Sequence, residues 1–316
     1  MRIRDKIKKP QRPVVAYEIL PPREKDGTLN SYAETISSLL SQTHIDAINI
    51  PEVHDEVGRG DNRPVSNQER GEPRKFGMLL QDIVGIEAIV NRVVVHVPFE
   101  EQMQWIEETY SKYEIDNMII VGGESSKQKY PGATVNQSLK AVSELMIDNK
   151  QNIFCGGICI PSRNKESKNL IKKSESGAEF FTTQVLCDSV NIIKMIKNYQ
   201  DRCNKIGTFP RRILLSFAPV SSQKNIDFLK WLGVEIPEDT EKYLKGRPGS
   251  MTERSLDVAI EVLNEILSYI SENNLKVPVG LNVEHIMSYN FQSSVEMLQE
   301  LARIYREFCI KTQQYN

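Results

Sequence analysis

The sequence predicts an α/β fold, a single (β/α)₈ barrel of the TIM type, from three observations. Short runs rich in β-branched and aromatic residues alternate with longer amphipathic runs along the whole chain. The β-rich runs are almost continuously apolar, which is typical of parallel strands with both faces covered. The strand–helix pair occurs eight times, the number that closes a barrel. An open doubly wound sheet is the competing fold, but no Gly-x-Gly-x-x-Gly follows the first strand.

The elements follow one another in regular order. The expected strands span residues 13–20, 46–51, 92–99, 117–123, 152–160, 178–186, 212–220 and 277–283. The expected helices span residues 29–42, 75–90, 100–113, 135–149, 164–176, 188–204, 222–233 with 252–273, and 291–309. In the 252–273 segment, Leu256, Ile260 and Leu263 recur at three- and four-residue steps and predict one buried helix face.

Two irregular connections, residues 52–74 and 125–135, follow the second and fourth strands. Loops at the carboxyl ends of barrel strands form the active-site face, so both connections are expected to border the site.

Composition indicates one globular domain over residues 1–316, with residues 1–12 as a basic N-terminal extension. The chain is 40% hydrophobic and 26% charged, with a net charge of −2 and no long block of one sign. Nothing in this balance requires nucleic acid or an acidic membrane as a partner, so a small ligand is favoured. No apolar run approaches the ~18 residues that span a bilayer, and no secretory signal is recognisable, so we expect a cytoplasmic protein.

The five cysteines are an odd number in a large chain, as is usual for reduced structural thiols. Cys155 and Cys159 share one strand face, but no second pair with zinc spacing follows. The acidic stretch that contains Glu52, His54 and Asp61 matches no known metal-binding loop. We expect no metal site.

Glu18 is the most informative polar residue, because it lies in the apolar run Val-Val-Ala-Tyr-Glu-Ile-Leu just before two prolines. A carboxyl in such surroundings loses hydration, which raises its pKa and suits general acid catalysis. The alternative is a carboxylate paired with a buried Arg or Lys.

Other polar residues also fall in or near strand ends. His96 ends an apolar run, and it is either a site residue or a satisfied core histidine. Gln184 could hold a ligand through its amide or tie two strands together. Asn49 and Asn282 are weaker candidates of the same kind.

Gly122, Gly123 and Glu124 end the fourth strand. Paired glycines allow a ligand or a backbone segment to approach closely, and the acid could accept a hydrogen bond from a hydroxyl or a ring nitrogen. A plain tight turn explains the glycines equally well.

Several segments resemble the methylenetetrahydrofolate reductase family. The most specific is Tyr-Glu-Ile-Leu-Pro-Pro-Arg at residues 17–23, which resembles the family pattern of an aromatic residue, Glu, two apolar residues and Pro-Pro-Arg. Four later parts of the chain resemble further family motifs, in the same order. They are His96, the segment at 177–188 that runs from Gly-Ala through Thr-Gln to Asp, Ala-Pro-Val-Ser at 218–221, and Met-Ser-Tyr at 287–289. The resemblance covers about residues 13–305.

This resemblance implies a barrel that reduces the methylene group of methylenetetrahydrofolate to methyl, with FAD reduced by NADH or NADPH. It assigns Glu18 as the general acid that protonates the ring nitrogen N10, and Gln184 as a pterin ligand. It places His96 at the flavin, Lys173 near the flavin phosphates, and Glu124 at the position of a family Asp beside the flavin ring. Asn49 and Asn282 are expected to help bind the substrate, and Gly122 and Gly123 to approach the cofactor.

The chain also departs from the family pattern. Arg-Gly-Asp is replaced by Gly122-Gly123-Glu124, and Thr-Tyr-Gly is replaced by Pro51-Glu52-Val53. Glu52 adds negative charge where FAD would lie, so we expect FAD binding to be weak or absent, with direct hydride transfer from the nicotinamide as one possibility. Two other functions stay open, namely pterin-dependent methyl transfer with a corrinoid partner and a non-catalytic barrel subunit. The chain could act as a homo-oligomer or with a partner subunit.

Overall fold

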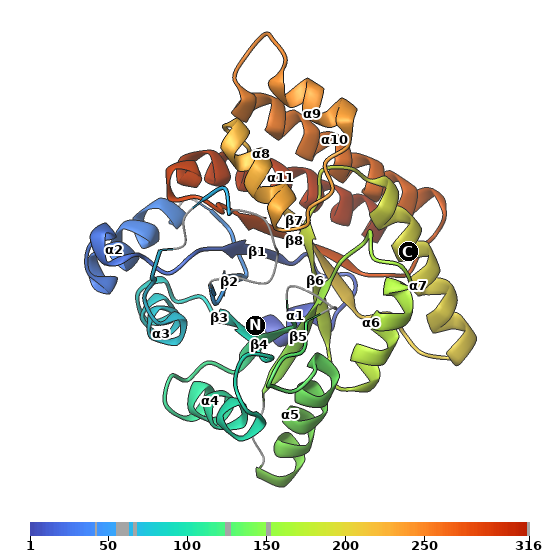
Figure 1. The fold of residues 1–316 in the computed structure, drawn as a ribbon. Helices are drawn as coiled ribbons and strands as arrows, with labels where there is room; N and C mark the ends of the chain where they lie inside the picture. The colour runs from blue at the N-terminus through green and yellow to red at the C-terminus, as the bar shows by residue number, and fades with distance from the viewer. Residues whose placement is uncertain (42, 55–62, 66–67, 124–127, 150–152, 315–316) are drawn as a thin grey trace.

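The computed structural model describes residues 1–41, 43–54, 63–65, 68–123, 128–149 and 153–314. Eight parallel strands close into a barrel in the order β1-β2-β3-β4-β5-β6-β7-β8, with β8 pairing back to β1 (Figure 1). Helices surround this barrel on the outside (Figure 1). The predicted (β/α)₈ fold is confirmed, and the open sheet is excluded because each strand has two strand neighbours.

Each of the eight predicted strands is present. They are β1 (Val15–Glu18), β2 (Ala47–Ile50), β3 (Ala88–Val93), β4 (Asn117–Val121), β5 (Phe154–Cys159), β6 (Phe180–Val185), β7 (Arg212–Phe217) and β8 (Val279–Glu284). The helices are α1 (Ile3–Ile7), α2 (Leu29–Leu40), α3 (Pro73–Val84), α4 (Phe99–Ser111), α5 (Val135–Asn149), α6 (Glu166–Glu175), α7 (Val190–Ile206), α8 (Gln223–Trp231), α9 (Glu238–Lys245), α10 (Met251–Glu272) and α11 (Phe291–Gln314). Short 3₁₀ turns lie at η1 (Glu24–Asp26) and η3 (Ser288–Asn290). The sequence did not predict α1 or α9.

The helix of the third unit ends earlier than expected. Residues 75–90 were predicted to be helical, but α3 ends at Val84 because Gly85 adopts a left-handed conformation with φ 70°. The Gly85 amide donates to the Gln81 carbonyl at 2.9 Å, which caps the helix.

The third strand is correspondingly shifted from the expected 92–99. β3 ends at Val93, and the remaining valines form a turn in which the Val94 amide donates to the Val121 carbonyl at 3.0 Å. His96 therefore follows the strand and does not lie in it.

Inside the barrel, the side chains change from apolar to polar along the strands. The apolar layer at the amino ends is made by Val14, Ala16, Ala47, Ile89, Ile119, Phe154, Phe180 and Leu214. Strand side chains alternate between the two faces, so the residues two positions further on point the same way. Those residues include Glu18, Asn49, Asn91, Thr182 and Ser216. The carboxyl ends of the strands thus form a polar layer above an apolar floor.

The N-terminal segment closes the opposite end of the barrel, where α1 lies across the strand starts (Figure 1). Ile3 and Ile7 are buried in the same cluster as the apolar floor. Arg4 forms an ion pair with Asp116 at 2.6 Å. Arg212, at the start of β7, donates to the carbonyls of Ile7 at 3.1 Å and Lys9 at 2.7 Å. These contacts give the basic N-terminal residues a structural role.

Candidate active site

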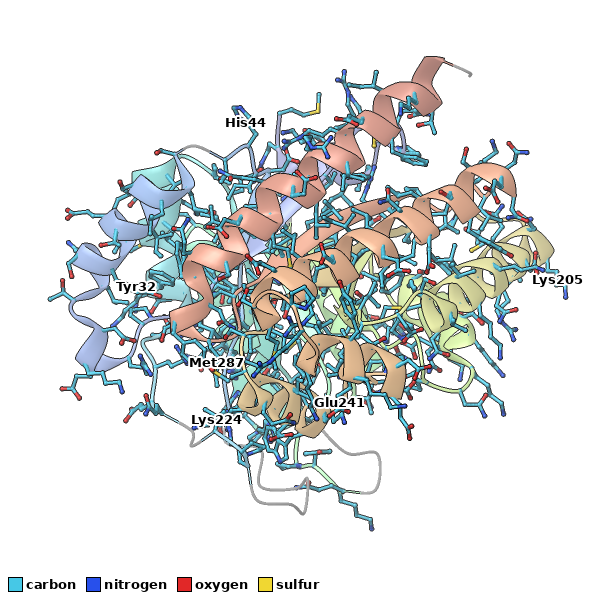
Figure 2. The ribbon with its side chains drawn as sticks, turned by 90° about the horizontal axis from the view of Figure 1, so that it is seen from above. Tyr32, His44, Lys205, Lys224, Glu241 and Met287 are labelled. Atoms are coloured by element: carbon cyan, nitrogen blue, oxygen red, sulfur yellow. The ribbon has the colours of Figure 1, made fainter. Side chains whose placement is uncertain are left out.

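A cavity of about 510 Å³ opens at the carboxyl ends of the strands. Strand residues such as Glu18, Asn91 and Glu284 line its base, and residues of the connecting loops line its wall. Met287 and Lys224, which belong to this wall, lie at the same end of the molecule (Figure 2). This is the face on which barrel enzymes carry their active sites.

Glu18 ends β1 and is held by two asparagines. Asn49 Nδ2 donates to Glu18 Oε2 at 2.6 Å, and Asn282 Nδ2 lies 3.4 Å from the same oxygen. Burial raises the pKa of Glu18 well above its usual range, and the negative charge of Glu284 raises it further. Among the described residues no Lys or Arg forms an ion pair with Glu18, as the alternative interpretation would require. Its surroundings therefore favour a protonated carboxyl near neutral pH.

Glu284 is the second carboxyl of the site, and the sequence did not single it out. It is the β8 residue paired in register with Glu18. Asn282 Nδ2 also lies 3.2 Å from Glu284 Oε1 and 3.1 Å from Ser216 Oγ. Burial raises the pKa of Glu284 to about 7, against the lowering effect of hydrogen bonds from Ser216 and Asn282. Side chains alternate between the two faces of a strand, so Glu284 points into the barrel like Asn282, two residues before it. The sequence did not mark Glu284 because the expected strand ended at residue 283.

His285 supports this end of the barrel from the next position. Its Nδ1 lies 3.2 Å from the backbone carbonyl oxygen of Glu18, and its ring stacks on Tyr17 with a centroid distance of 6.5 Å. Burial lowers the pKa of His285 to about 4, so the imidazole is neutral near pH 7. It fixes the backbone of Glu18 and adds no positive charge to the site.

Gln184 lines the cavity from the end of β6. Its Nε2 donates to the Leu232 carbonyl at 2.8 Å, just after α8. The amide therefore contacts a loop backbone, and does not tie β6 to a neighbouring strand through this bond. Asn91 also lines the cavity, and its buried Oδ1 has no hydrogen-bond partner in the described part of the chain. The sequence pattern does not mark Asn91, because it places the start of the third strand four residues too late.

Three arginines and one lysine add positive charge to the cavity wall. Arg23 forms an ion pair with Asp26 at 2.7 Å, and Arg70 donates to the Pro21 carbonyl at 2.8 Å. Burial and the nearby charge of Arg23 lower the pKa of Arg70, although an arginine stays protonated in water. The wall is therefore suited to an anionic group on a ligand.

Comparison with known proteins agrees with this arrangement. A family model described as methylenetetrahydrofolate reductase matches residues 2–302. The chain belongs to this family. The family that the sequence resembles is thereby confirmed, and membership of it indicates an oxidoreductase-like protein related to folate.

A solved structure with a similar fold is described as an uncharacterized protein from Clostridium thermocellum that binds two copies of 5-methyl-5,6,7,8-tetrahydrofolic acid. It is 19% identical with a TM-score of 0.77, and the match covers 96% of this chain and 99% of that chain. A 2,3-dimethylmalate lyase matches at 12% identity and a TM-score of 0.44, over 99% of this chain and 97% of that chain. No curated protein matches.

His96, Gly122 and Gly123, which the family resemblance assigns to the flavin, are not among the residues that line the cavity. His96 packs against His54, with ring centroids 5.0 Å apart, and against Tyr130 at 5.6 Å. A Cβ on Gly123 would lie 2.3 Å from the Tyr130 ring, so this ring covers the glycine, and a Cβ on Gly122 would meet Val135 at 3.2 Å. Glu124 lies outside the described residues.

Lys173 is also engaged elsewhere. Its Nζ donates to the Ile158 carbonyl and lies 3.4 Å from Glu166 Oε1. It is not among the residues that line the cavity. Together with the covered glycines, this means that the described residues do not fit the flavin contacts expected of a methylenetetrahydrofolate reductase.

The sequence predicted that the negative charge of Glu52 would repel FAD, but in the structure this charge has partners of its own. Arg92 forms an ion pair with Glu52, and the Val93 amide donates to Glu52 Oε2 at 2.8 Å. Burial alone would raise the pKa of Glu52, but His54, Arg92 and the Val93 amide outweigh it and lower the pKa. The carboxylate is ionised, yet its charge is offset by Arg92.

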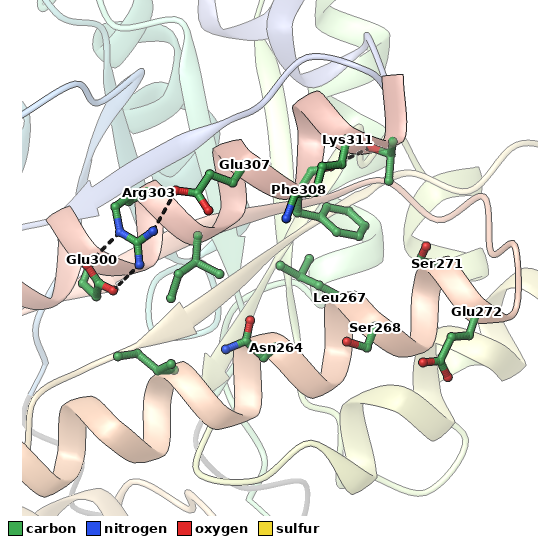
Figure 3. A pocket seen from close by; sticks show the side chains of 13 residues that line it. Asn264, Leu267, Ser268, Ser271, Glu272, Glu300, Arg303, Glu307, Phe308 and Lys311 are labelled. Carbon is green, nitrogen blue, oxygen red and sulfur yellow. Dashed lines mark hydrogen bonds and ion pairs between the residues drawn. The ribbon is translucent and has the colours of Figure 1, made fainter. Parts of the chain in front are cut away.

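A second hollow, of about 630 Å³, lies on the outside of the barrel between α10 and α11 (Figure 3). Arg303 of α11 lies along it and pairs with Glu300 at 2.6 Å and Glu307 at 2.7 Å (Figure 3). The charge of Arg303 is thus paired within its own helix. Among the described residues that line the groove, no buried side-chain nitrogen or oxygen is left without a hydrogen-bond partner, unlike at the cavity at the strand ends.

Burial raises the pKa of the Cys155 and Cys187 thiols to about 12, so neither is a thiolate near neutral pH. Within the described ranges, no three His, Cys, Asp or Glu side chains are grouped to hold a metal ion. No helix in those ranges is long and apolar enough to span a membrane.

Proposed function

We propose that this protein reduces the methylene group of 5,10-methylenetetrahydrofolate, or of a related methylene-pterin, to a methyl group. The observation that carries the proposal is Glu18, a carboxyl at the base of the 510 Å³ cavity whose pKa is raised by burial. Family membership supplies the reaction class, and the neighbour from Clostridium thermocellum supports a reduced folate as the ligand.

In this proposal Glu18 is the general acid. It donates its proton to the ring nitrogen N10, and the bond between that nitrogen and the methylene carbon breaks with its electron pair going to the nitrogen. The open iminium then accepts a hydride at carbon. A carboxyl that stays protonated near neutral pH is needed for the first step, and its environment favours that form.

The other strand-end residues position the reactants. Asn49 and Asn282 hold Oε2 of Glu18 and leave its other oxygen available for a proton. Gln184 and Asn91 would contact the pterin, whose ring nitrogens and carbonyl match amide donors and acceptors. Arg23 and Arg70 would face the carboxylate end of the folate.

The hydride donor in this proposal is NADH or NADPH. The described residues do not present the contacts that the family uses for FAD, because Tyr130 covers Gly123 and Lys173 is bound to Ile158 and Glu166. We therefore assign no step to a flavin and propose that FAD, where it associates, is held weakly.

The test is an anaerobic assay of the purified protein with methylenetetrahydrofolate and each nicotinamide, with and without added FAD. Formation of 5-methyltetrahydrofolate with equal oxidation of the nicotinamide supports the proposal. Exchange of the methyl group with an added corrinoid, without nicotinamide oxidation, would instead support methyl transfer. Folate binding without either reaction would support a non-catalytic subunit.

A further inference from the structure

The carboxyls of Glu18 and Glu284 share one partner. They end the neighbouring strands β1 and β8 in paired register, and both line the same cavity. Asn282 Nδ2 lies 3.4 Å from Glu18 Oε2, 3.2 Å from Glu284 Oε1 and 3.1 Å from Ser216 Oγ. An amide nitrogen carries only two hydrogens, so it cannot serve three acceptors at once.

This geometry offers two buried carboxyls only a few uncharged hydrogen-bond donors. No Lys or Arg in the described ranges forms an ion pair with either carboxyl. Asn49 donates to Glu18 alone, and the Ser216 hydroxyl gives Glu284 one further hydrogen bond. Two adjacent carboxylates in such a site repel each other, so one of them keeps a proton.

We propose that Glu18 and Glu284 form a carboxylic acid dyad that holds one proton between them, and that this is the proton donated to the substrate. The donation of this proton to the substrate rests on the proposed function, whereas the existence of the dyad does not. On donation an O–H bond breaks, its electron pair stays on the carboxylate, and an N–H bond forms on the substrate. The dyad passes from a total charge of −1 to −2, and solvent returns the proton after the product leaves.

The side chains in contact with the dyad are neutral near pH 7. β2 contributes the neutral Asn49, β7 contributes Ser216, and β8 contributes Asn282. His285 contacts the Glu18 backbone and is neutral near pH 7, since burial lowers its pKa to about 4. The other charged or titratable groups that line the cavity are Arg23 and Arg70, which keep their charge through the neutral range, together with Arg63, Lys224, Glu52 and His54. His54 lies 3.2 Å from Glu52, whose charge is also offset by Arg92.

The dyad can be tested without substrate by ¹³C NMR of the full-length protein labelled at the Glu side-chain carboxyl carbon. The Glu18 resonance is assigned by its absence in Glu18→Gln. In the unmodified protein we expect Glu18 and Glu284 to titrate in two coupled steps, the upper one above the ordinary range of Glu. In Glu284→Gln, Glu18 should titrate in one step, at a pH lower by about one unit or more.

A matched control is Glu261→Gln, which removes a carboxyl from the exposed face of α10 and should leave the Glu18 curve unchanged. Glu284→Ala serves as a second variant if the Gln variant folds poorly. An unchanged Glu18 titration in a folded Glu284 variant would overturn the dyad.

The reduction assay tests the donated proton. If the dyad supplies it, the alkaline limb of the kcat/KM profile moves down in Glu284→Gln by the same shift that NMR gives for Glu18. A limb that stays in place while the NMR curve shifts would refute proton donation by the dyad. If the unmodified protein reduces no methylenetetrahydrofolate, the proposed function fails, and the NMR titration still decides whether the dyad exists.

Discussion

Replacing Glu284 with Gln should change how the stability of the protein depends on pH. The pKa of Glu284 is about 7 in the fold, against an ordinary value of 4.5. Between these two values the folded protein binds more protons than the unfolded chain, so the stability of the unmodified protein falls as pH rises through this window. At about 1.36 kcal/mol for each pKa unit, the loss amounts to about 3 kcal/mol. Gln cannot ionise, so the variant is spared this loss.

Thermal unfolding at several pH values measures the effect. An unfolding entropy of about 2.1 cal/mol/K per residue over 316 residues makes 3 kcal/mol worth about 5 °C. The difference in Tm between Glu284→Gln and the unmodified protein should therefore change by about 5 °C in favour of the variant between about pH 4.5 and about pH 8. The exposed Glu261→Gln is the control for loss of a carboxyl. Parallel Tm curves for Glu284→Gln and the unmodified protein would refute the argument that burial destabilises the charge.

Three further outcomes concern the site. Glu18→Gln should lower the rate of reduction of the methylene substrate by a factor of about 10²–10⁴. The Kd for 5-methyltetrahydrofolate, measured by calorimetry, should change little, and an equal loss of binding would indicate a structural role. Gln184→Ala should raise the substrate KM with little change in Tm; a drop of several degrees at unchanged KM would assign the amide to its bond with Leu232. FAD added to the protein should be lost on dialysis, as absorbance reports, and stoichiometric FAD after gel filtration would contradict this.

The fold was predictable because each strand–helix unit carries its own pattern. Eight apolar runs separated by amphipathic segments define the barrel, since near-continuous apolar strands need helices on one face and a packed interior on the other. The third unit was placed late because Gly85, which ends α3, lies among apolar residues on both sides, and the valines after Val93 look like a strand although they form a turn. α9 was missed because its eight residues are mostly charged and bury only Leu244.

The site was predictable where a polar residue interrupts an apolar strand. Glu18, Asn49 and Asn282 stood out for that reason, and the structure brings them into contact. Glu284 did not, because the expected strand ended at residue 283, and only the pairing of β8 with β1 places it opposite Glu18. Such contacts between residues far apart in sequence depend on barrel closure, which the residue pattern of a single strand does not contain.

The expectation of weak FAD binding now depends on different residues from those that first suggested it. Repulsion from Glu52 does not support this expectation, because Arg92 and the Val93 amide offset the charge of Glu52. The expectation of weak FAD binding depends instead on packing at the ends of β4 and β5. Tyr130 occupies the space that Gly123 would leave open for a ligand, and Lys173 is held by Ile158 and Glu166 away from the cavity lining. Because Tyr130 must move before a flavin could approach Gly123, Tyr130→Ala should increase FAD retention if packing is the cause, whereas Glu52→Gln should not.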